Sequence, residues 1–446
     1  MLKLKNKLLS GAFLLCLGTF VAKVLGAVYR IPLTRFLGAE GIGVYQMVFP
    51  VYALLLDFSG SALPNGLAKT IAQNKNRANE YLKVAIKTFF KVGLVGSVLL
   101  VLVSFPLSKL QATSLATACY ITLAPAVFLV SLISCYRGFF QGKLNMLPTA
   151  TSQIIEQAVK LVLGLSLCYI FRRNLQLALI LATTSVTVSE LVAFIYLRAK
   201  FKGCKEQNTF VPTDKIQDKT LVKQIIKSTF PITLLGLILP FSQILDGIIT
   251  VNILGRYLTN ATALYGLLSG VCLTVINLPV SICHGIATVT IPTLSADKEN
   301  QTKRAGQAFV LTLAISLPCA LFCLYFSPFI IKVLFGSLSA TDKEIASGLI
   351  KTTSFAIVFL SLLQTGNAVL IGLNSPKLPI ISLSVGVIIK TLLSITLLKD
   401  KRLNIYGGAI ALIACYFFAC LVNLILIIAK ENGYARKTTV NRRQNA

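Results

Sequence analysis

The stretch YRIPLTRFLGAEGIGVYQMVFPVY, residues 29–52, joins two long apolar runs near the start of the chain. It places two arginines, Arg30 and Arg35, on either side of Pro32. A charge at the centre of a lipid bilayer costs about 2.5–3.5 kcal/mol on insertion scales, so it needs water or a partner. The role of these arginines therefore depends on the solvent that surrounds the chain.

The composition indicates that most of the chain lies in a lipid bilayer. Of the 446 residues, 55% are hydrophobic and 13% are charged, and the mean hydropathy is +0.78. Soluble domains carry about 25% charged residues. Apolar runs long enough to cross about 30 Å of hydrocarbon as helices recur along the chain, and the short alternating strands of a β-barrel are not apparent. The sequence predicts an all-α polytopic membrane protein.

The apolar runs predict about twelve transmembrane helices. The first six are predicted at residues 8–29, 42–68, 84–107, 115–140, 148–171 and 175–198. The last six are predicted at residues 226–254, 261–290, 306–333, 347–373, 378–398 and 405–429. We therefore expect an N-terminal lobe (1–200), a cytoplasmic linker (201–222), a C-terminal lobe (223–430) and a basic tail (431–446).

The formal net charge of +28 predicts topology and not nucleic-acid binding. Lysine and arginine are concentrated in alternate loops, near residues 69–83, 137–143, 200–223 and 298–304, and in the tail. Such an excess marks the cytoplasmic side of membrane proteins and meets anionic lipid. We expect both termini in the cytoplasm. The eleven cysteines lie mostly in apolar runs without CxxC pairs, so neither a disulfide framework, a metal site nor a cofactor is predicted.

The two groups of six runs resemble each other in sequence. Short matches follow in the same order: RFL (35–37) with RYL (256–258), NGLA (65–68) with HGIA (284–287), QGKLNMLP (141–148) with IGLNSPKLP (371–379), and Lys160 with Lys390. Their shared order predicts an internal duplication. Units with an even number of helices insert in the same orientation, which predicts two pseudo-symmetric lobes around a central cavity.

The charges of the first run predict a basic stripe in a water-filled cavity. Lys23 and Arg30 are seven residues apart and lie on one face of a helix. Pro32 is expected to interrupt that helix and to free backbone groups that need water or protein partners. The alternative is that Arg30 and Arg35 extend to the lipid headgroups.

Other charged residues inside the runs leave two interpretations open. Asp57 pairs with one of the cations of the first run, or takes part in proton or sodium coupling. Glu156 and Lys160 are spaced i,i+4 and can neutralise each other, a structural or a functional pair.

The second lobe carries isolated ionisable residues as well. Asp246 and Lys390 are each alone in apolar surroundings, so a mutual salt bridge is the simplest hypothesis. His284, the single histidine, is either a hydrogen-bonded structural residue or a ligand or proton relay.

The candidate cavity charges are mostly basic: Lys23, Arg30, Lys160, Lys351, Lys390 and Arg256, against Asp57, Glu156, Glu190 and Asp246. A cationic cavity favours an anionic substrate, and ammonium and guanidinium groups bind phosphate through charge-assisted hydrogen bonds. As substrate-binding residues we predict Lys23, Arg30, Asp57, Arg256 and Lys351. As coupling residues or ion pairs within a lobe we predict Glu156, Lys160, Asp246 and Lys390.

Two long stretches resemble a known family: GAVYRIPLTRFLGAEGIGVYQMVFPVYALLLDFSGSALPNGLAKTIAQ (26–73) and YRGFFQGKLNMLPTATSQIIEQAVKLVLG (136–164). They are similar to the polysaccharide-transporter branch of the MOP exporter superfamily, in particular its stage V sporulation protein B and lipid II flippase group. The resemblance implies a MATE-like fold that moves undecaprenyl-diphosphate-linked sugars to the outer leaflet by alternating access.

The resemblance also carries residue roles. Cavity arginines of the family's first helix map onto Lys23 and Arg30. Some relatives hold sodium between an acid on helix 7 and polar residues on helix 11. Asp246 fits the first position, but Lys390 stands at the second, where its ammonium would occupy the place of the metal. The group has fourteen helices, whereas twelve are typical of drug-exporting and O-unit-flipping relatives.

We therefore expect a non-enzymatic flippase of lipid-linked oligosaccharides in the bacterial plasma membrane, acting as a monomer among membrane lipids. Coupling by membrane potential, proton or sodium stays open. The alternative is a proton- or sodium-coupled multidrug exporter. A membrane-embedded glycosyltransferase or ligase would need acidic residues or histidine in an outer loop, and the predicted outer loops have no such cluster.

Overall fold

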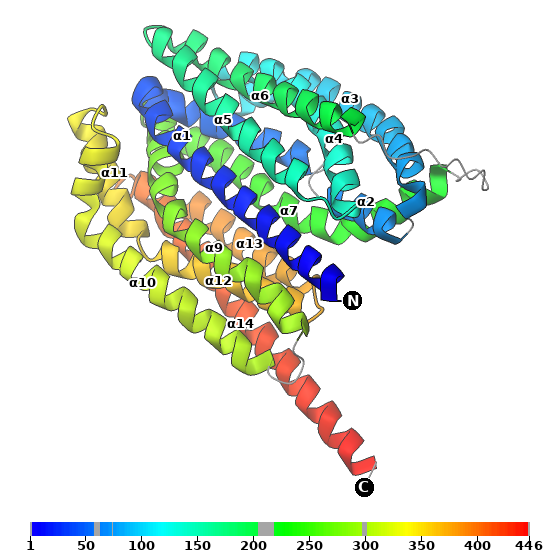
Figure 1. Cartoon of the computed structure of the whole chain (residues 1–446). Helices are drawn as coiled ribbons and strands as arrows, with labels where there is room; N and C mark the ends of the chain where they lie inside the picture. Colours follow the sequence, from blue (N-terminus) through cyan, green and yellow to red (C-terminus); the bar gives the residue numbers. More distant parts are fainter. Residues whose placement is uncertain (1, 58–62, 74, 204–217, 297–300, 445–446) are drawn as a thin grey trace. The chain divides into compact units, whose positions relative to one another are not determined.

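The computed structural model describes residues 2–57, 63–73, 75–203, 218–296 and 301–444. Within these ranges every regular element is helical (Figure 1), which confirms the predicted all-α fold. Contacts divide the chain into two compact units, Met1–Ile248 and Ile249–Ala446. Residues 204–217 of the predicted linker lie outside the described residues, and the predicted lobe boundaries stay predictions.

The first unit contains the helices from α1 to most of α7. They are α1 (Leu2–Leu56), α2 (Leu63–Gln73), the short 3₁₀ helix η2 (Lys75–Arg77), α3 (Ala78–Leu110), α4 (Leu115–Gly142), α5 (Leu147–Ile170), α6 (Leu175–Gly203) and α7 (Asp218–Leu254). The bounds of α4, α5 and α6 follow the predicted runs closely, because a bilayer of fixed thickness needs apolar helices of similar length.

The second unit contains the end of α7 and all later helices. They are α8 (Ala261–Gly266), the π-helical turn η3 (Leu267–Cys272), α9 (Leu273–Ala296), α10 (Gln301–Leu334), α11 (Ala340–Thr353), α12 (Ala356–Gly372), α13 (Leu378–Leu397) and α14 (Ile405–Gln444). Among the described residues, ten helices are long and apolar enough to span a membrane, and the bent pair α11–α12 makes eleven.

The first two predicted runs meet in one long element, and the break lies at a different residue than expected. Helix α1 continues through Pro32, where an interruption was predicted, and is non-helical only at Gly38. Membrane helices tolerate proline because neighbouring groups satisfy the freed backbone. Gly38 has φ 68° and ψ −175°, a conformation that is essentially restricted to glycine. The FLGAEG sequence therefore provides the bend.

The internal duplication is visible in the turn geometry of each unit. Between α4 and α5, the amide of Leu144 donates to the carbonyl of Gln141 (2.9 Å), and its φ is 59°. In the turn between α12 and α13, Asn374, 230 positions later, donates to Ile371 (2.9 Å) with a φ of 60°. Several buried positions of α5 are also buried 230 positions later, in the pairs Ser152 and Ser382, Lys160 and Lys390, and Cys168 and Leu398. This shared register supports the predicted duplication.

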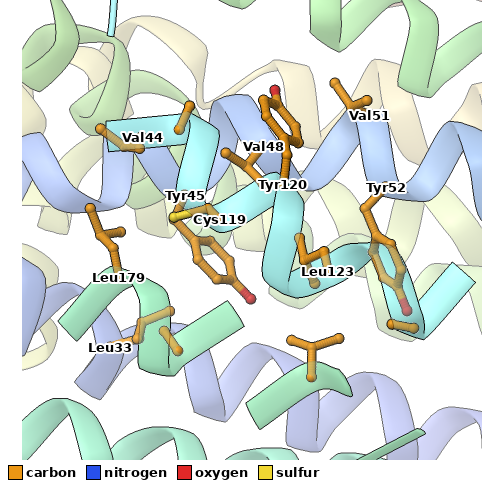
Figure 2. Packing of buried hydrophobic residues seen from close by; sticks show 14 of the residues in the cluster. Leu33, Val44, Tyr45, Val48, Val51, Tyr52, Cys119, Tyr120, Leu123 and Leu179 are labelled. Atoms are coloured by element: carbon orange, nitrogen blue, oxygen red, sulfur yellow. The ribbon is translucent and has the colours of Figure 1, made fainter. Parts of the chain in front are cut away.

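The core of the first unit joins α1 to α4 and α6. Tyr45 from α1, Cys119 from α4 and Leu179 from α6 are fully or almost fully buried and belong to one cluster (Figure 2). Tyr45 and Tyr52 project from the segment of α1 that follows Gly38, and both are buried. The bend at Gly38 therefore sets the direction of the helix segment that supplies these aromatic side chains to the core.

We predict that Gly38→Ala lowers the free energy of unfolding by about 1–3 kcal/mol, because a Cβ makes this backbone conformation unfavourable. No atom lies within 4 Å of a Cβ built there, so the cost comes from the backbone alone. Gly306→Ala in α10 is the matched control, since its site is equally open and has no left-handed φ. Thermal melting of the two purified variants checks this, and equal stability of both would contradict it.

Candidate functional site

A half-buried ion pair joins α4 to α5 inside the first unit. Arg137 donates from Nη2 to Oε2 of Glu156 (3.1 Å) and from Nε to the hydroxyl of Ser152 (3.0 Å). The two charged side chains are 14% and 17% exposed. Buried charges are tolerated only when they are paired and hydrogen-bonded, and both conditions hold here. Oε1 of Glu156 also accepts a hydrogen bond from the side-chain amide of Gln157 (2.9 Å), so each carboxylate oxygen of Glu156 accepts one hydrogen bond.

A second carboxylate, Glu190 of α6, is buried with one oxygen unused. Its side chain is 3% exposed, and Oε1 accepts a hydrogen bond from the hydroxyl of Tyr52 (3.3 Å). Oε2 has no hydrogen-bond partner among the described residues. A buried acceptor without a partner costs about 1–3 kcal/mol, so this oxygen is a group that gains from meeting a ligand or water.

Two cations, Lys160 and Arg30, lie near these carboxylates. Lys160 of α5 is 8% exposed, and its ammonium lies 5.7 Å from the ring of Tyr29. It interacts electrostatically with Glu156, Glu190 and Arg30. Arg30 of α1 also interacts electrostatically with Tyr45, and its guanidinium makes no hydrogen bond within the described part of the chain. Arg30 and Lys160 are thus neighbouring like charges.

A cavity of about 350 Å³ lies within the first unit, next to the ion pair. Its charged lining residues are Asp57, Arg137, Glu156 and Glu190, and its amide and hydroxyl lining residues are Thr19, Asn65, Ser134, Gln141, Thr149 and Gln153. The hydroxyl of Thr19 donates to Oε1 of Gln153 (3.1 Å), which ties α1 to α5. Leu56, Pro64 and Val130 are its only apolar lining residues among those described.

Asp57 lines this cavity and lies against α7. A Cβ built on Gly236 would come within 3.3 Å of the Asp57 carboxylate, so the glycine permits this close approach. The carboxylate lies directly after the end of α1. Whether it pairs with Lys23 stays a prediction, because the side chain of Lys23 lies outside the described residues.

The second unit has the same framework without this charge cluster. In the shared register of 230 positions, Asn367 corresponds to Arg137, Gly386 to Glu156, and Cys420 to Glu190. The equivalent helices α12, α13 and α14 form without these charges. Lys390 retains the position of Lys160 and is 5% exposed. The same framework therefore also forms with uncharged residues at these positions, which favours a functional role for Glu190 in the first unit.

The remaining predicted site residues are distributed over the chain. Arg256 and Lys351 are exposed in the second unit, in the turn after α7 and in the last turn of α11. Asp246 lies in the first unit and Lys390 in the second, and their salt bridge stays a prediction. Glu156 pairs with Arg137, not with Lys160 as the i,i+4 spacing suggested.

The sequence reasoning missed Arg137, which it assigned only to a basic cytoplasmic loop. A signal was present, since Arg137 falls inside the predicted run 115–140 and a charge within a run needs a partner. Its pairing with Ser152 and Glu156 depends on contact between helices, which local spacing does not show. Tyr52, the partner of Glu190, was missed for the same reason.

In the second unit, His284 forms a polar contact instead of a metal site. Its Nδ1 lies 3.2 Å from Oε1 of Gln364, joining α9 to α12. Across the described residues, no group of three or more His, Cys, Asp or Glu is placed to hold a metal ion. This hydrogen bond favours the structural alternative for His284.

We predict that Arg137→Ala lowers the free energy of unfolding by about 1–3 kcal/mol, because it removes the charged hydrogen-bond partner of the half-buried Glu156. Arg77→Ala provides the control, since its pair with Glu80 (3.0 Å) has side chains that are 28% and 48% exposed. An exposed pair contributes about 0–1 kcal/mol. Denaturation of the purified variants in detergent measures both. A loss for Arg137→Ala no larger than that for Arg77→Ala would show that the half-buried pair is not structural.

Comparisons with known proteins identify the class. Residues 8–297 match the family model described as "Polysaccharide biosynthesis protein", and residues 231–396 match the model "MatE". The chain belongs to the polysaccharide biosynthesis protein family, and it is a multi-pass membrane transporter of the MOP superfamily.

Two bacterial membrane proteins are similar to this chain over nearly its whole length. The chain is 25% identical to "Lipid II flippase MurJ" of Bacillus subtilis (strain 168), over 98% of this chain and 86% of the relative. It is 27% identical to "Stage V sporulation protein B" of the same organism, over 92% and 81%. These alignments cover nearly the whole chain.

Solved structures share the fold. An inward-facing multidrug resistance MATE family transporter of the MOP superfamily has a TM-score of 0.77 at 14% identity, covering 93% of this chain and 96% of that one. Lipid II flippase MurJ in an inward closed conformation has a TM-score of 0.73 at 16% identity, covering 93% and 87%. The resemblance predicted from residues 26–73 and 136–164 is confirmed.

Proposed function

We propose that this protein is a flippase that moves undecaprenyl-diphosphate-linked oligosaccharide across the bacterial cytoplasmic membrane by alternating access. It does so as a monomer with both termini in the cytoplasm, and without catalysing a covalent reaction. The observation that carries the proposal is the pair of neighbouring cations Arg30 and Lys160 in the first unit of a chain related to a lipid II flippase.

The two cations suit a diphosphate in charge and in chemistry. Like charges that lie together inside a helix bundle repel each other, and an anion that accepts hydrogen bonds from both removes this cost. A guanidinium binds phosphate oxygens in a fork and an ammonium binds them as a point charge. Lys23, two helical turns before Arg30 on the same face, adds a third cation in this proposal.

The membrane potential is a sufficient energy source for this transport. Moving one elementary charge across 100 mV is worth about 2.3 kcal/mol, so outward transfer of two negative charges yields about 4.6 kcal/mol. This holds when the cations of the protein do not cross with the substrate. Proton or sodium coupling is therefore not required thermodynamically, although the carboxylates Asp57, Glu156 and Glu190 are groups that could bind either ion.

Transport in proteoliposomes tests the proposal. We expect Arg30→Ala, Lys160→Ala and Lys23→Ala each to reduce the transfer of an undecaprenyl-diphosphate-linked sugar at least tenfold, because a charge-assisted phosphate contact contributes about 1.5–3 kcal/mol. The headgroup is detected in the outer leaflet by its accessibility to a membrane-impermeant reagent. Arg77→Ala, an exposed cation outside this group, serves as the control and should transport normally. Normal transfer by both Arg30→Ala and Lys160→Ala would refute the assignment.

A second function, export of cationic drugs, is favoured by two observations. Residues 231–396 match the MatE model, and the lining of the first-unit cavity has three carboxylates against one guanidinium. Expression in a drug-sensitive bacterium separates the two functions. Drug resistance that is lost in Asp57→Asn would support the exporter, whereas a flippase should confer no resistance.

A further inference from the structure

The first-unit cavity presents hydrogen-bonding groups that the structure leaves unused. We propose that this cavity binds the first sugar of the lipid-linked glycan through its hydroxyl groups, an inference that rests on the proposed flippase function. Oε2 of Glu190 has no partner, and the side-chain amides of Gln141 and Gln153 donate no hydrogen bond within the described chain.

These groups match a polyhydroxylated ligand. A sugar hydroxyl donates one hydrogen bond and accepts others, a carboxylate accepts, and an amide both donates and accepts. Glu190 would accept from a hydroxyl, while the amide NH₂ of Gln153 would donate to one, because its Oε1 is already bonded to Thr19. Glu190 is buried with an oxygen that has no partner among the described residues, and such a group discriminates strongly in favour of a ligand that satisfies it.

The size of the cavity favours a small organic group over a single ion. Its volume is about 350 Å³. One water molecule takes about 30 Å³ in the liquid, and small-molecule pockets begin at about 300 Å³. A lone sodium ion or proton would leave most of this space to water. Among the residues that the structure describes, none form a cluster suited to a metal ion.

The negative charge of the cavity lining disfavours binding of the phosphates inside the cavity. We therefore expect the diphosphate to bind beside the cavity, at Arg30 and Lys160. Asp57, Glu156 and Glu190 outnumber Arg137, so a diphosphate would be repelled from this cavity. Lys160 follows Glu156 by four residues, which is one helical turn and about 6 Å along α5. A diphosphate bound by Arg30 and Lys160 would therefore hold the attached sugar at the lining of the cavity.

The internal duplication shows that these polar groups are dispensable for folding. In the register of 230 positions, Leu383 corresponds to Gln153 and Cys420 to Glu190. Both are buried in the second unit. The variant Gln153→Leu therefore introduces the residue that the other copy of the scaffold already accommodates.

Equilibrium binding to the full-length protein in nanodiscs tests the inference. The probes are undecaprenyl diphosphate and the same lipid carrying one N-acetylglucosamine. We expect the wild type to bind the sugar-bearing lipid about tenfold more tightly than the bare lipid. Gln153→Leu and Glu190→Gln should reduce this ratio to about one. Gln153→Leu should leave the affinity for the bare lipid unchanged, whereas Glu190→Gln also removes a negative charge that interacts with Lys160 and should not weaken binding of the bare lipid. Gln307→Leu, an exposed position on α10, should retain the wild-type ratio.

Three outcomes would overturn the inference. The first is a ratio of about one in the wild type with clear binding of the bare lipid, which leaves the diphosphate site intact. The second is an unchanged ratio in Gln153→Leu and Glu190→Gln. The third is a wild type that is stabilised by sodium through Glu190 but shows no sugar preference, which would make the cavity an ion site. Failure of both lipids to bind would instead refute the flippase function.

Discussion

The cost of burying charge in an apolar helix bundle determines how the first unit is arranged. Arg137 and Glu156 meet that cost by pairing with each other across α4 and α5. Only one carboxylate oxygen of Glu190 has a hydrogen-bond partner among the described residues, the hydroxyl of Tyr52. Arg30 and Lys160 are neighbouring like charges. Groups that remain incompletely satisfied in the protein alone gain free energy when a complementary ligand arrives. The structural pair and the binding groups are thus distinguished by how fully each charge is compensated.

Duplication separates what the fold requires from what the function requires. Both units build the same turns and the same buried register, and both keep a buried lysine on the fifth helix of the repeat, at Lys160 and Lys390. At the positions equivalent to Arg137, Glu156 and Glu190, the second unit has uncharged residues. The two copies of the scaffold therefore differ in charge at positions where the second copy has small or neutral residues. This gives matched substitutions that test function while preserving packing.

The sequence predicted the helices well and the site only in part. The bounds of α4, α6 and α13 follow from apolar run length, because the thickness of the bilayer fixes that length. The bend at Gly38 was assigned to Pro32, since proline is the stronger breaker in water but not in a membrane bundle. The pairing of Arg137 was invisible because it joins helices whose contact is set by tertiary packing. Asp57 and Glu156 were found because a carboxylate in an apolar run is conspicuous.

In the proposed transport, cations of the first unit recognise the diphosphate of a lipid-linked sugar. The most direct measurement compares two lipids in proteoliposomes of the wild-type protein, one with the sugar attached through a diphosphate and one with the same sugar attached through an uncharged ether. We expect rapid transfer of the diphosphate lipid, accelerated by an inside-negative potential, and no transfer of the ether. Equal transfer of both lipids would contradict it.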